Sequence, residues 1–459
     1  MPLLVKNARI VTATADYTAD IYCERETITR IDRTIDQWTL PPCDILDAAG
    51  LITFPGFIDP HVHVYLPFMG TFAKDTWASA SRAALLGGTT TLVEMICPAR
   101  ADDPVSACDL WRSKARESVC DYSFHMGVTR FDERTTAALK QIVDSGITSF
   151  KVFLAYKGAL GIDDHELFDT LRLARELGVV VAAHCENEEL VALLQKQLLA
   201  AGKTGPEWHE PSRPAYVEAS GVHHLCAFAE ATGARVYIVH TSCEPAVAEA
   251  RRAAARGVRV DVEAVITHLT LDCSYAERPD FDGAKYVMSP PLRENRHQEA
   301  LWRALAAGDI ATVATDHAPF DFATQKSMGK GDFTKIPNGI PSVEDRVNLL
   351  YTRGVCEGRI DLHTFVRVAS TNAARILGLS TKGDIAVGLD ADLCLYDPNH
   401  RGVISATTHA MQTDYSAFEG FELKGRPRHV VRRGEIVVRD AALVANPSQG
   451  RLTPRVGTG

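Results

Sequence analysis

Residues 57–63 read Phe-Ile-Asp-Pro-His-Val-His and place two histidines, His61 and His63, one residue apart at the end of an apolar stretch. In an extended strand, side chains two positions apart point to the same face. The two imidazoles therefore aim at one point, which is the geometry of a shared metal ion. Two surface histidines would give the same pattern, so the interpretation needs support from the rest of the chain.

Apolar runs of the same kind recur along the middle of the chain. They are rich in Val, Ile, Thr and Phe, as expected of strands buried on both faces. The predicted strands are Gly56–Asp59, Thr90–Met95, Tyr122–Val128, Ser149–Leu154, Val179–His184, Val236–Thr241, Val258–Glu263 and Ile310–Asp316. Stretches of helical character between them include Asp75–Leu86, Glu133–Asp144, Asp164–Leu177 and Pro245–Ala255. Strands alternating with helices predict an α/β fold, a (β/α)8 TIM barrel.

Further ligand-type residues lie on these predicted strands. In a barrel, chemistry gathers at the carboxyl ends of the strands. The candidate ligands are His61 and His63 after strand one, Lys151 in strand four, His184 ending strand five, His240 ending strand six and Asp316 ending strand eight. A lone histidine is more often a core residue than a ligand, but this set predicts a metal centre. Such ligands suit zinc, manganese or iron, and two ions ~3.5–4 Å apart could share them.

Lys151 is the unusual member of this set. A charged ammonium group beside two divalent cations is repelled, and burying it unpaired is costly. Lys151 could point away and pack, or it could form a Schiff base with a carbonyl substrate as a neutral amine. Its amine could also take up carbon dioxide and bridge two metals as a carbamate. The residues alone leave these three possibilities open.

Both ends of the chain read differently from the middle. They contain short β-rich segments separated by polar turns and glycines. Chain termini often lie close together in space. We therefore expect a small β-sandwich domain made of residues 1–55 plus 380–459, and a metal-dependent barrel domain over residues 56–379.

Composition narrows the class of protein and of partner. The chain has 459 residues, of which 46% are hydrophobic and 23% charged, as in ordinary globular proteins. A net charge of -9 without a basic block argues against a nucleic-acid partner, and no apolar run reaches the ~18 residues of a membrane helix. Eleven scattered cysteines and the lack of a signal-peptide pattern predict a cytoplasmic protein with free thiols.

Several motifs resemble one known family. Residues 56–63 resemble the entry motif of the amidohydrolase superfamily, and residues 150–157 (Phe-Lys-Val-Phe-Leu-Ala-Tyr-Lys) resemble the lysine motif of hydantoinases and dihydropyrimidinases. Residues 331–339 are similar to a stretch of microbial hydantoinases, and residues 285–293 to their substrate loop. The resemblance continues to residues 388–392 and so covers nearly the whole chain. It is with the cyclic amidohydrolases of the hydantoinase/dihydropyrimidinase family.

The resemblance implies a binuclear centre with assigned roles. Lys151 would be carbamylated by carbon dioxide and bridge two divalent ions, zinc or alternatively manganese. The buried ion would be held by His61, His63 and Asp316, and the exposed ion by His184 and His240. Tyr156 would donate to the oxyanion, and Ser289 and Asn338 would hold the ring amides, largely through backbone groups. The family also implies a homotetramer or homodimer.

The implied reaction is hydrolysis of a cyclic amide C–N bond. A metal-bridging hydroxide would attack a carbonyl carbon of a hydantoin or dihydropyrimidine ring, and the exposed metal with Tyr156 would stabilise the oxyanion. Asp316 would act first as general base and then as general acid. The product would be an N-carbamoyl amino acid, so we expect a small cyclic amide as the partner and no nucleic acid or membrane.

Three alternatives remain. An allantoinase or dihydroorotase typically has an arginine just after the metal pair; residues 64–74 contain none, which favours uncharged or apolar substituents, although Lys74 could substitute. A lyase could use Lys151 as a Schiff base. A non-catalytic binding protein of the dihydropyrimidinase-related type is opposed by the six filled ligand positions.

Residues 262–268 depart from the family, with His268 where an aromatic residue is common.

Overall fold

The centre of the molecule is a parallel barrel. The structure, a computed structural model, describes residues 1–446 and 449–459; positions 447–448 of the expected terminal β-domain lie outside the described residues. Within the described chain the barrel strands are β6 (Phe57–Val62), β9 (Thr89–Ile96), β10 (Asp121–Gly127), β11 (Ser149–Phe153), β12 (Val180–His184), β13 (Val236–Ile238), β14 (Val260–Val265) and β15 (Thr312–Ala314). Neighbours pair in parallel and in chain order, so the predicted barrel is confirmed.

The first and last barrel strands meet beside the predicted ligands. The His63 N–H donates to the carbonyl of His317 over 2.7 Å, and the Asp316 N–H donates to the carbonyl of His61 over 3.0 Å. These two bonds close the barrel between β6 and β15. They also hold the two chain segments that carry His61, His63 and Asp316 side by side.

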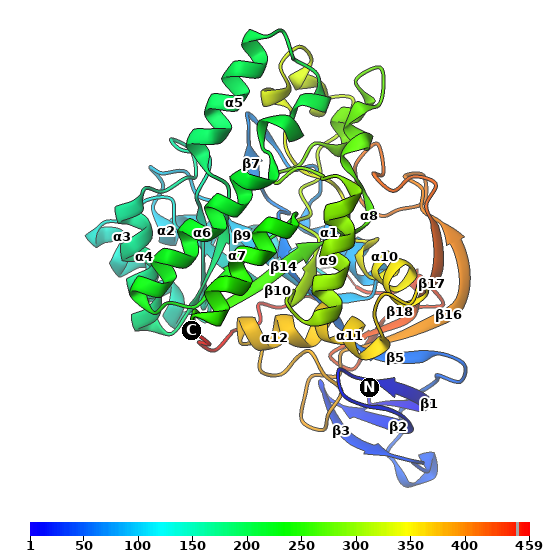
Figure 1. Cartoon of the computed structure of the whole chain (residues 1–459). Coiled ribbons are helices and arrows are strands. Elements are labelled where there is room, and N and C mark those ends of the chain that lie inside the picture. Colours follow the sequence, from blue (N-terminus) through cyan, green and yellow to red (C-terminus); the bar gives the residue numbers. More distant parts are fainter. Residues whose placement is uncertain (447–448) are drawn as a thin grey trace.

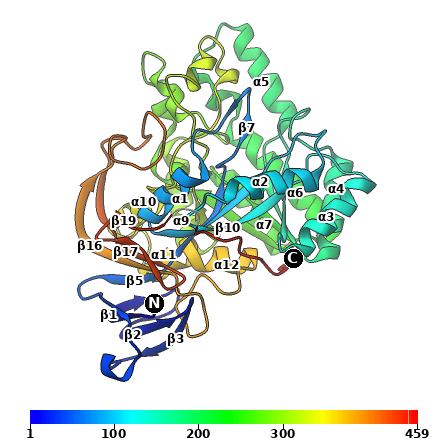
Figure 2. The ribbon, with the colours of Figure 1, turned by 180° about the vertical axis from the view of Figure 1, so that it is seen from behind.

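Helices surround the barrel (Figures 1 and 2). The longer ones are α1 (Trp77–Leu86), α2 (Pro104–Ala115), α3 (Glu133–Asp144), α4 (Asp164–Leu177), α5 (Glu188–Ala200), α6 (Ala215–Thr232), α7 (Glu244–Ala255) and α9 (Asn295–Ala307). Shorter helices are α8 (Ile266–Thr270), α10 (Arg346–Leu349), α11 (Leu362–Val366) and α12 (Asn372–Leu377). Local sequence sets the ends of α4, because Asp163 and Glu166 form a capping box and Gly178 ends the helix at a φ of 65°.

Both termini contribute to one further sheet. Its order among the described residues is β19-β18-β17-β16-β5-β1-β2-β3, with β4 beside β1. Its strands are β1 (Leu3–Val11), β2 (Asp16–Glu24), β3 (Thr27–Asp32), β4 (Asp44–Asp47), β5 (Ile52–Pro55), β16 (Leu393–Val403), β17 (Glu422–Arg432), β18 (Glu435–Arg439) and β19 (Ala442–Leu443). Figure 1 shows this sheet to one side of the barrel. The expected β-structure from both termini is therefore present.

Buried charges join the terminal sheet to the barrel. The Lys382 ammonium lies 2.8 Å from Asp121 at the start of β10 and 2.6 Å from Asp392 next to β16. The last residues of the chain cross the same end of the barrel, where the Thr453 N–H donates to the carbonyl of Tyr122 over 2.7 Å. This end is opposite the one that carries the predicted ligands. In the described part of the chain, no helix has both the length and the apolar character needed to span a bilayer.

Candidate metal centre

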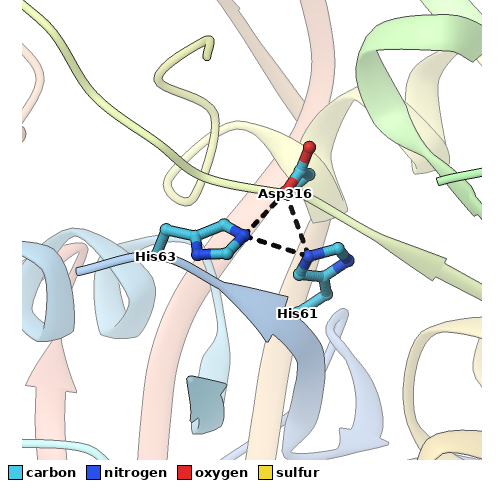
Figure 3. A group of neighbouring side chains, drawn as sticks. All are labelled: His61, His63 and Asp316. Atoms are coloured by element: carbon cyan, nitrogen blue, oxygen red, sulfur yellow. Dashed lines mark hydrogen bonds and ion pairs between the residues drawn. The ribbon is translucent and has the colours of Figure 1, made fainter. Parts of the chain in front are cut away.

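Three predicted ligands form a tight group at the carboxyl ends of β6 and β15 (Figure 3). The Nε2 atoms of His61 and His63 lie 3.0 and 3.3 Å from one carboxylate oxygen of Asp316, and 3.3 Å from each other. Two nitrogen ligands bound at ~2.1 Å to a tetrahedral ion are ~3.4 Å apart. The spacing of this group therefore fits one metal ion.

A second pair of predicted ligands lies beside the first group. His184 ends β12, and its Nδ1 atom is 3.0 Å from Nε2 of His240. The His240 ring centroid is 5.4 Å from that of His61, so the two groups are neighbours. His184 and His240 line the same small cavity as His63, Asp316 and Lys151. The five strands thus bring all six candidate ligands to one place.

Lys151 lies on β11 with its side chain fully buried. Its amine lines the cavity with the histidines and finds no hydrogen-bond partner among the described residues. Burial lowers the pKa of Lys151, although the nearby Asp316 carboxylate opposes that shift. The Lys151 side chain therefore does not point away from the site. A lysine that lines the cavity without a hydrogen-bond partner is the group that a bridging carbamate would need. The donor set as a whole fits two divalent ions.

The carboxylate of Glu263, which sequence reasoning missed, orients ligands of both groups. One of its oxygens accepts hydrogen bonds from Nδ1 of His61 over 2.8 Å and from the backbone N–H of His240 over 2.9 Å. In the neutral ring, the bond to Nδ1 places the proton on that atom and leaves Nε2 of His61 able to bind a metal. Glu263 is the last residue of the seventh predicted strand. A carboxylate at the carboxyl end of a barrel strand could therefore have indicated a role for it in the site.

Glu186 has the same effect on the second pair. Its carboxylate accepts from Nε2 of His184 over 2.8 Å and from the Arg213 guanidinium over 2.5 Å. Burial would raise the pKa of Glu186, but Arg213 and His184 bring it down to about 2. Nδ1 of His184 is therefore the ring nitrogen that remains able to bind a metal. No sequence pattern indicated Arg213. It lies in an irregular connection, many residues along the chain from the barrel strands on either side of it.

Backbone conformation is unusual at three of the predicted site residues. Tyr156, His240 and Asp316 have φ angles of 64°, 42° and 51°, in the left-handed region that residues other than glycine rarely adopt. Such conformations persist only where the surrounding structure enforces them, and they cluster at functional sites. At His240 and Asp316 they also end the extended geometry of β13 and β15 earlier than the apolar runs predict.

The protonation states of the two candidate catalytic groups are distinct. Burial alone would raise the pKa of Asp316, but His61, His63 and His240 hold it well below its ordinary value. Burial raises the pKa of Tyr156 above its ordinary 10.0. At neutral pH the site therefore offers an ionised carboxylate, which can accept a proton, and a protonated phenol, which can donate a hydrogen bond.

The predicted substrate-binding residues line the same cavity. The Asn338 side-chain amide donates to Oγ of Ser289 over 3.0 Å, and both residues border the metal-facing cavity of about 50 Å³. A chamber of about 690 Å³ adjoins this cavity at Phe68 and Tyr156. The site therefore has a small cavity at the candidate metal ligands and a larger chamber next to that cavity.

Comparisons with known proteins agree with this geometry. The model of the Amidohydrolase family matches residues 52–437. The chain is 44% identical to a D-hydantoinase of Geobacillus stearothermophilus, covering 100% of this chain and 98% of the relative, and 36% identical to the dihydropyrimidinase of Rattus norvegicus, covering 99% and 88%. The solved structure of a D-hydantoinase (dihydropyrimidinase) from Thermus sp. matches with a TM-score of 0.97 at 56% identity, covering 99% of each chain.

Proposed function

The chain belongs to the Amidohydrolase family, and on that premise we propose that it hydrolyses a hydantoin or dihydropyrimidine ring to an N-carbamoyl amino acid. It is a hydrolase of cyclic amide C–N bonds, of the hydantoinase/dihydropyrimidinase group. The observation that carries the proposal is the meeting of six ligand-type side chains from five strands, one of which is the unpartnered amine of Lys151.

Asp316 is the group that moves the proton. The six candidate ligands would hold two divalent ions, which would supply Lewis-acid activation of water and of the amide carbonyl. The ionised Asp316 carboxylate takes a proton from the attacking water as its oxygen bonds to the ring carbonyl carbon. When the ring C–N bond breaks, Asp316 returns that proton to the leaving nitrogen. One water is consumed, and the products are a carboxylate and an N-carbamoyl group on one molecule.

Tyr156, Ser289 and Asn338 hold the ring. The raised pKa of Tyr156 keeps its hydroxyl protonated, so it can donate to the oxygen that becomes negative during attack. Ser289 and Asn338 line the same cavity, which supports their holding the ring amides, largely through backbone groups. A donor aimed at the developing charge is worth roughly 10²–10³ in rate.

The adjoining chamber favours uncharged or apolar ring substituents. Phe68, Trp111 and Leu160 contribute apolar surface to it. Its arginine, Arg213, is already paired with Glu186, and Glu188 adds negative charge nearby. A substrate carboxylate would therefore meet no unpaired guanidinium there. This supports a hydantoinase or dihydropyrimidinase over a dihydroorotase.

One assay panel tests the activity. Hydantoin, 5-substituted hydantoins of both hands, dihydrouracil, allantoin and dihydroorotate are offered to the same preparation, and its metal content is measured. We expect turnover of hydantoins and dihydrouracil, with the D-substituted hydantoins preferred, as in the similar D-hydantoinases. Turnover of dihydroorotate alone would overturn the substrate assignment. Activity that survives removal of all metal, with substrate trapped on Lys151 by borohydride, would favour the lyase.

We also propose that the ions are zinc and that Lys151 carries the carbamate. The imidazole-rich ligand set supports zinc, and the partnerless amine supports the modification. In Lys151→Ala, metal binding and activity should fall together, and acetate or propionate should restore part of both by supplying the missing carboxylate. Lys140→Met, which alters an exposed lysine on the outer surface, is the matched control. Rescue by amines instead of carboxylates would contradict the carbamate.

We also propose an assembly, a location and domain limits. Family membership supports a homotetramer or homodimer, which analytical ultracentrifugation would distinguish from a single chain. Eleven free cysteines support a cytoplasmic location. The connection pattern of the terminal sheet supports a β-domain of residues 1–55 plus 380–459 and a barrel domain of residues 56–379.

A further inference from the structure

The substrate-binding wall is built from irregular chain whose backbone carbonyls lie close to buried side-chain donors. Residues 287–290 read Val-Met-Ser-Pro and include Ser289, while Asn338 belongs to a separate loop after β15. Neither segment is in a strand or a long helix, so barrel geometry does not fix their position. Contacts from other residues must therefore fix both segments with the precision that a ring-binding site needs.

Lys326 joins the two segments. Its side chain is completely buried, and its amine donates to the carbonyl of Val287 over 2.8 Å and to the carbonyl of Gly339 over 2.7 Å. Val287 lies two residues before Ser289, and Gly339 directly follows Asn338. The Gly339 N–H also donates to the Val287 carbonyl over 3.0 Å. One lysine thus ties together both halves of the wall.

The amine suits this position as a neutral group. Burial holds the pKa of Lys326 well below its ordinary value. An ammonium group has three N–H donors, whereas the neutral amine has two. The two carbonyl acceptors therefore match the two N–H donors of a neutral amine. A permanently charged residue would leave a buried charge without a counterion at this place.

Two histidines hold the neighbouring residues of the same segment. Nε2 of His209 lies 2.8 Å from the carbonyl of Met288, and Nε2 of His268 lies 3.0 Å from the carbonyl of Pro290. A carbonyl only accepts, so both Nε2 atoms carry the proton. Burial lowers the pKa of His209 to about 3 and that of His268 to about 4, so both rings stay neutral.

We propose that Lys326, His209 and His268 act as positioning residues, a clamp of three buried side-chain donors in which Lys326 holds residues 287–290 against the loop of Asn338 and the two histidines hold the carbonyls of Met288 and Pro290. The clamp sets where Ser289 and Asn338 meet the ring amides. Its role in ring binding rests on the proposed function, but the immobilisation of residues 287–290 does not. A purely structural role would contribute stability without affecting ring binding, and this difference is measurable.

The test uses Lys326→Met and His268→Phe in the metal-loaded enzyme. Lys326→Met keeps the length of the side chain and removes its donors, and His268→Phe keeps a flat ring without one. Lys330→Met, an exposed lysine in the same loop, is the matched control. Each variant is examined for KM and kcat on hydantoin, metal content, unfolding temperature, and hydrogen–deuterium exchange of peptides covering residues 285–292 and 336–341.

We expect KM to rise about tenfold in each clamp variant, as for the loss of one well-placed hydrogen bond, with kcat and metal content nearly unchanged. Both peptides should exchange faster, and Lys330→Met should match the wild type. A lower unfolding temperature with unchanged KM and unchanged local exchange would overturn the clamp. So would a fall in kcat at constant KM.

The experiment distinguishes failure of the clamp from failure of the proposed function. If the wild type hydrolyses no cyclic amide, the proposed function is wrong, whereas local exchange still decides whether the clamp exists. If Lys326→Met does not fold, His268→Phe alone decides, because it loses only one donor. Unchanged exchange of residues 285–292 in His268→Phe would then reject the clamp.

Discussion

The two roles proposed for Asp316, metal ligand and proton carrier, are compatible with its geometry. One oxygen of its carboxylate faces the Nε2 atoms of His61 and His63, and the residue takes a strained backbone conformation at the end of its strand. The surrounding imidazoles keep its pKa well below the ordinary value, so it is ionised at any pH where the protein works. Asp316 can therefore bind a cation and still be the base nearest the attacking water.

Asp316→Asn should separate these roles. The amide oxygen can still bind a metal, but the group no longer accepts a proton at neutral pH. We expect kcat on hydantoin to fall by about 10²–10⁴, the range for loss of a general acid–base group, while KM changes little. Steady-state kinetics and metal analysis on the same sample measure both. Near-normal turnover with metal still bound would show that another group moves the proton.

The six candidate ligands were predictable from the sequence, whereas their supporting residues were not. The histidines, Lys151 and Asp316 lie at or near the carboxyl ends of apolar runs. In a barrel, those strand ends are where functional residues gather. Arg213, His209 and Lys326 lie in irregular segments, and each acquires its role by contact with a residue far away in the chain. Such contacts follow from tertiary packing and leave no local pattern.

At the scale of elements, prediction succeeded where local rules act. The ranges of α3 and α4 match the predicted ones, because charged and apolar residues alternate at helical spacing and acidic caps mark the starts. β13 and β15 are shorter than predicted, at Val236–Ile238 and Thr312–Ala314. Their apolar runs continue, but the backbone leaves the extended conformation near His240 and Asp316 to serve the site.

Asp163→Ala tests whether the outer helices act only as scaffold. The Asp163 side chain accepts from the Glu166 N–H at the start of α4, over 2.9 Å. Its removal should lower the free energy of unfolding by about 1 kcal/mol and leave kcat/KM unchanged. Urea unfolding and hydantoin turnover measure these quantities, and Asp169→Ala on the same helix is the control. A large loss of activity in a folded variant would contradict the scaffold role.

At the scale of the whole molecule, buried acids lie where the terminal sheet meets the barrel. Glu344 follows β15 in the chain and borders a cavity of about 240 Å³, whose other wall includes His400 of β16 and Arg426 of β17. Burial raises the pKa of Glu344 from 4.5 to about 7, despite a hydrogen bond from the Ala410 N–H. Folding therefore favours the protonated form of this carboxyl.

The sign of the pH effect follows from that shift. Because the folded pKa lies above the unfolded one, the stabilising contribution is complete below about pH 4.5 and is lost as pH rises through about 7. Glu344→Gln keeps an acceptor for the Ala410 N–H and cannot ionise. Between pH 5 and pH 8 the wild type should lose roughly 2–3 kcal/mol of unfolding free energy relative to the variant. Denaturant titrations that run parallel across this range would contradict the assignment.

Metal titration tests the central claim most directly. Metal-free protein is titrated with zinc in bicarbonate buffer, and bound metal and hydantoin hydrolysis are measured at each step. If side chains from five strands and a carbamate on Lys151 hold a pair of ions that activates the ring amide, activity should reach its maximum at about two ions per chain and remain low without carbon dioxide. Full activity at one ion per chain, or without metal, would contradict that arrangement.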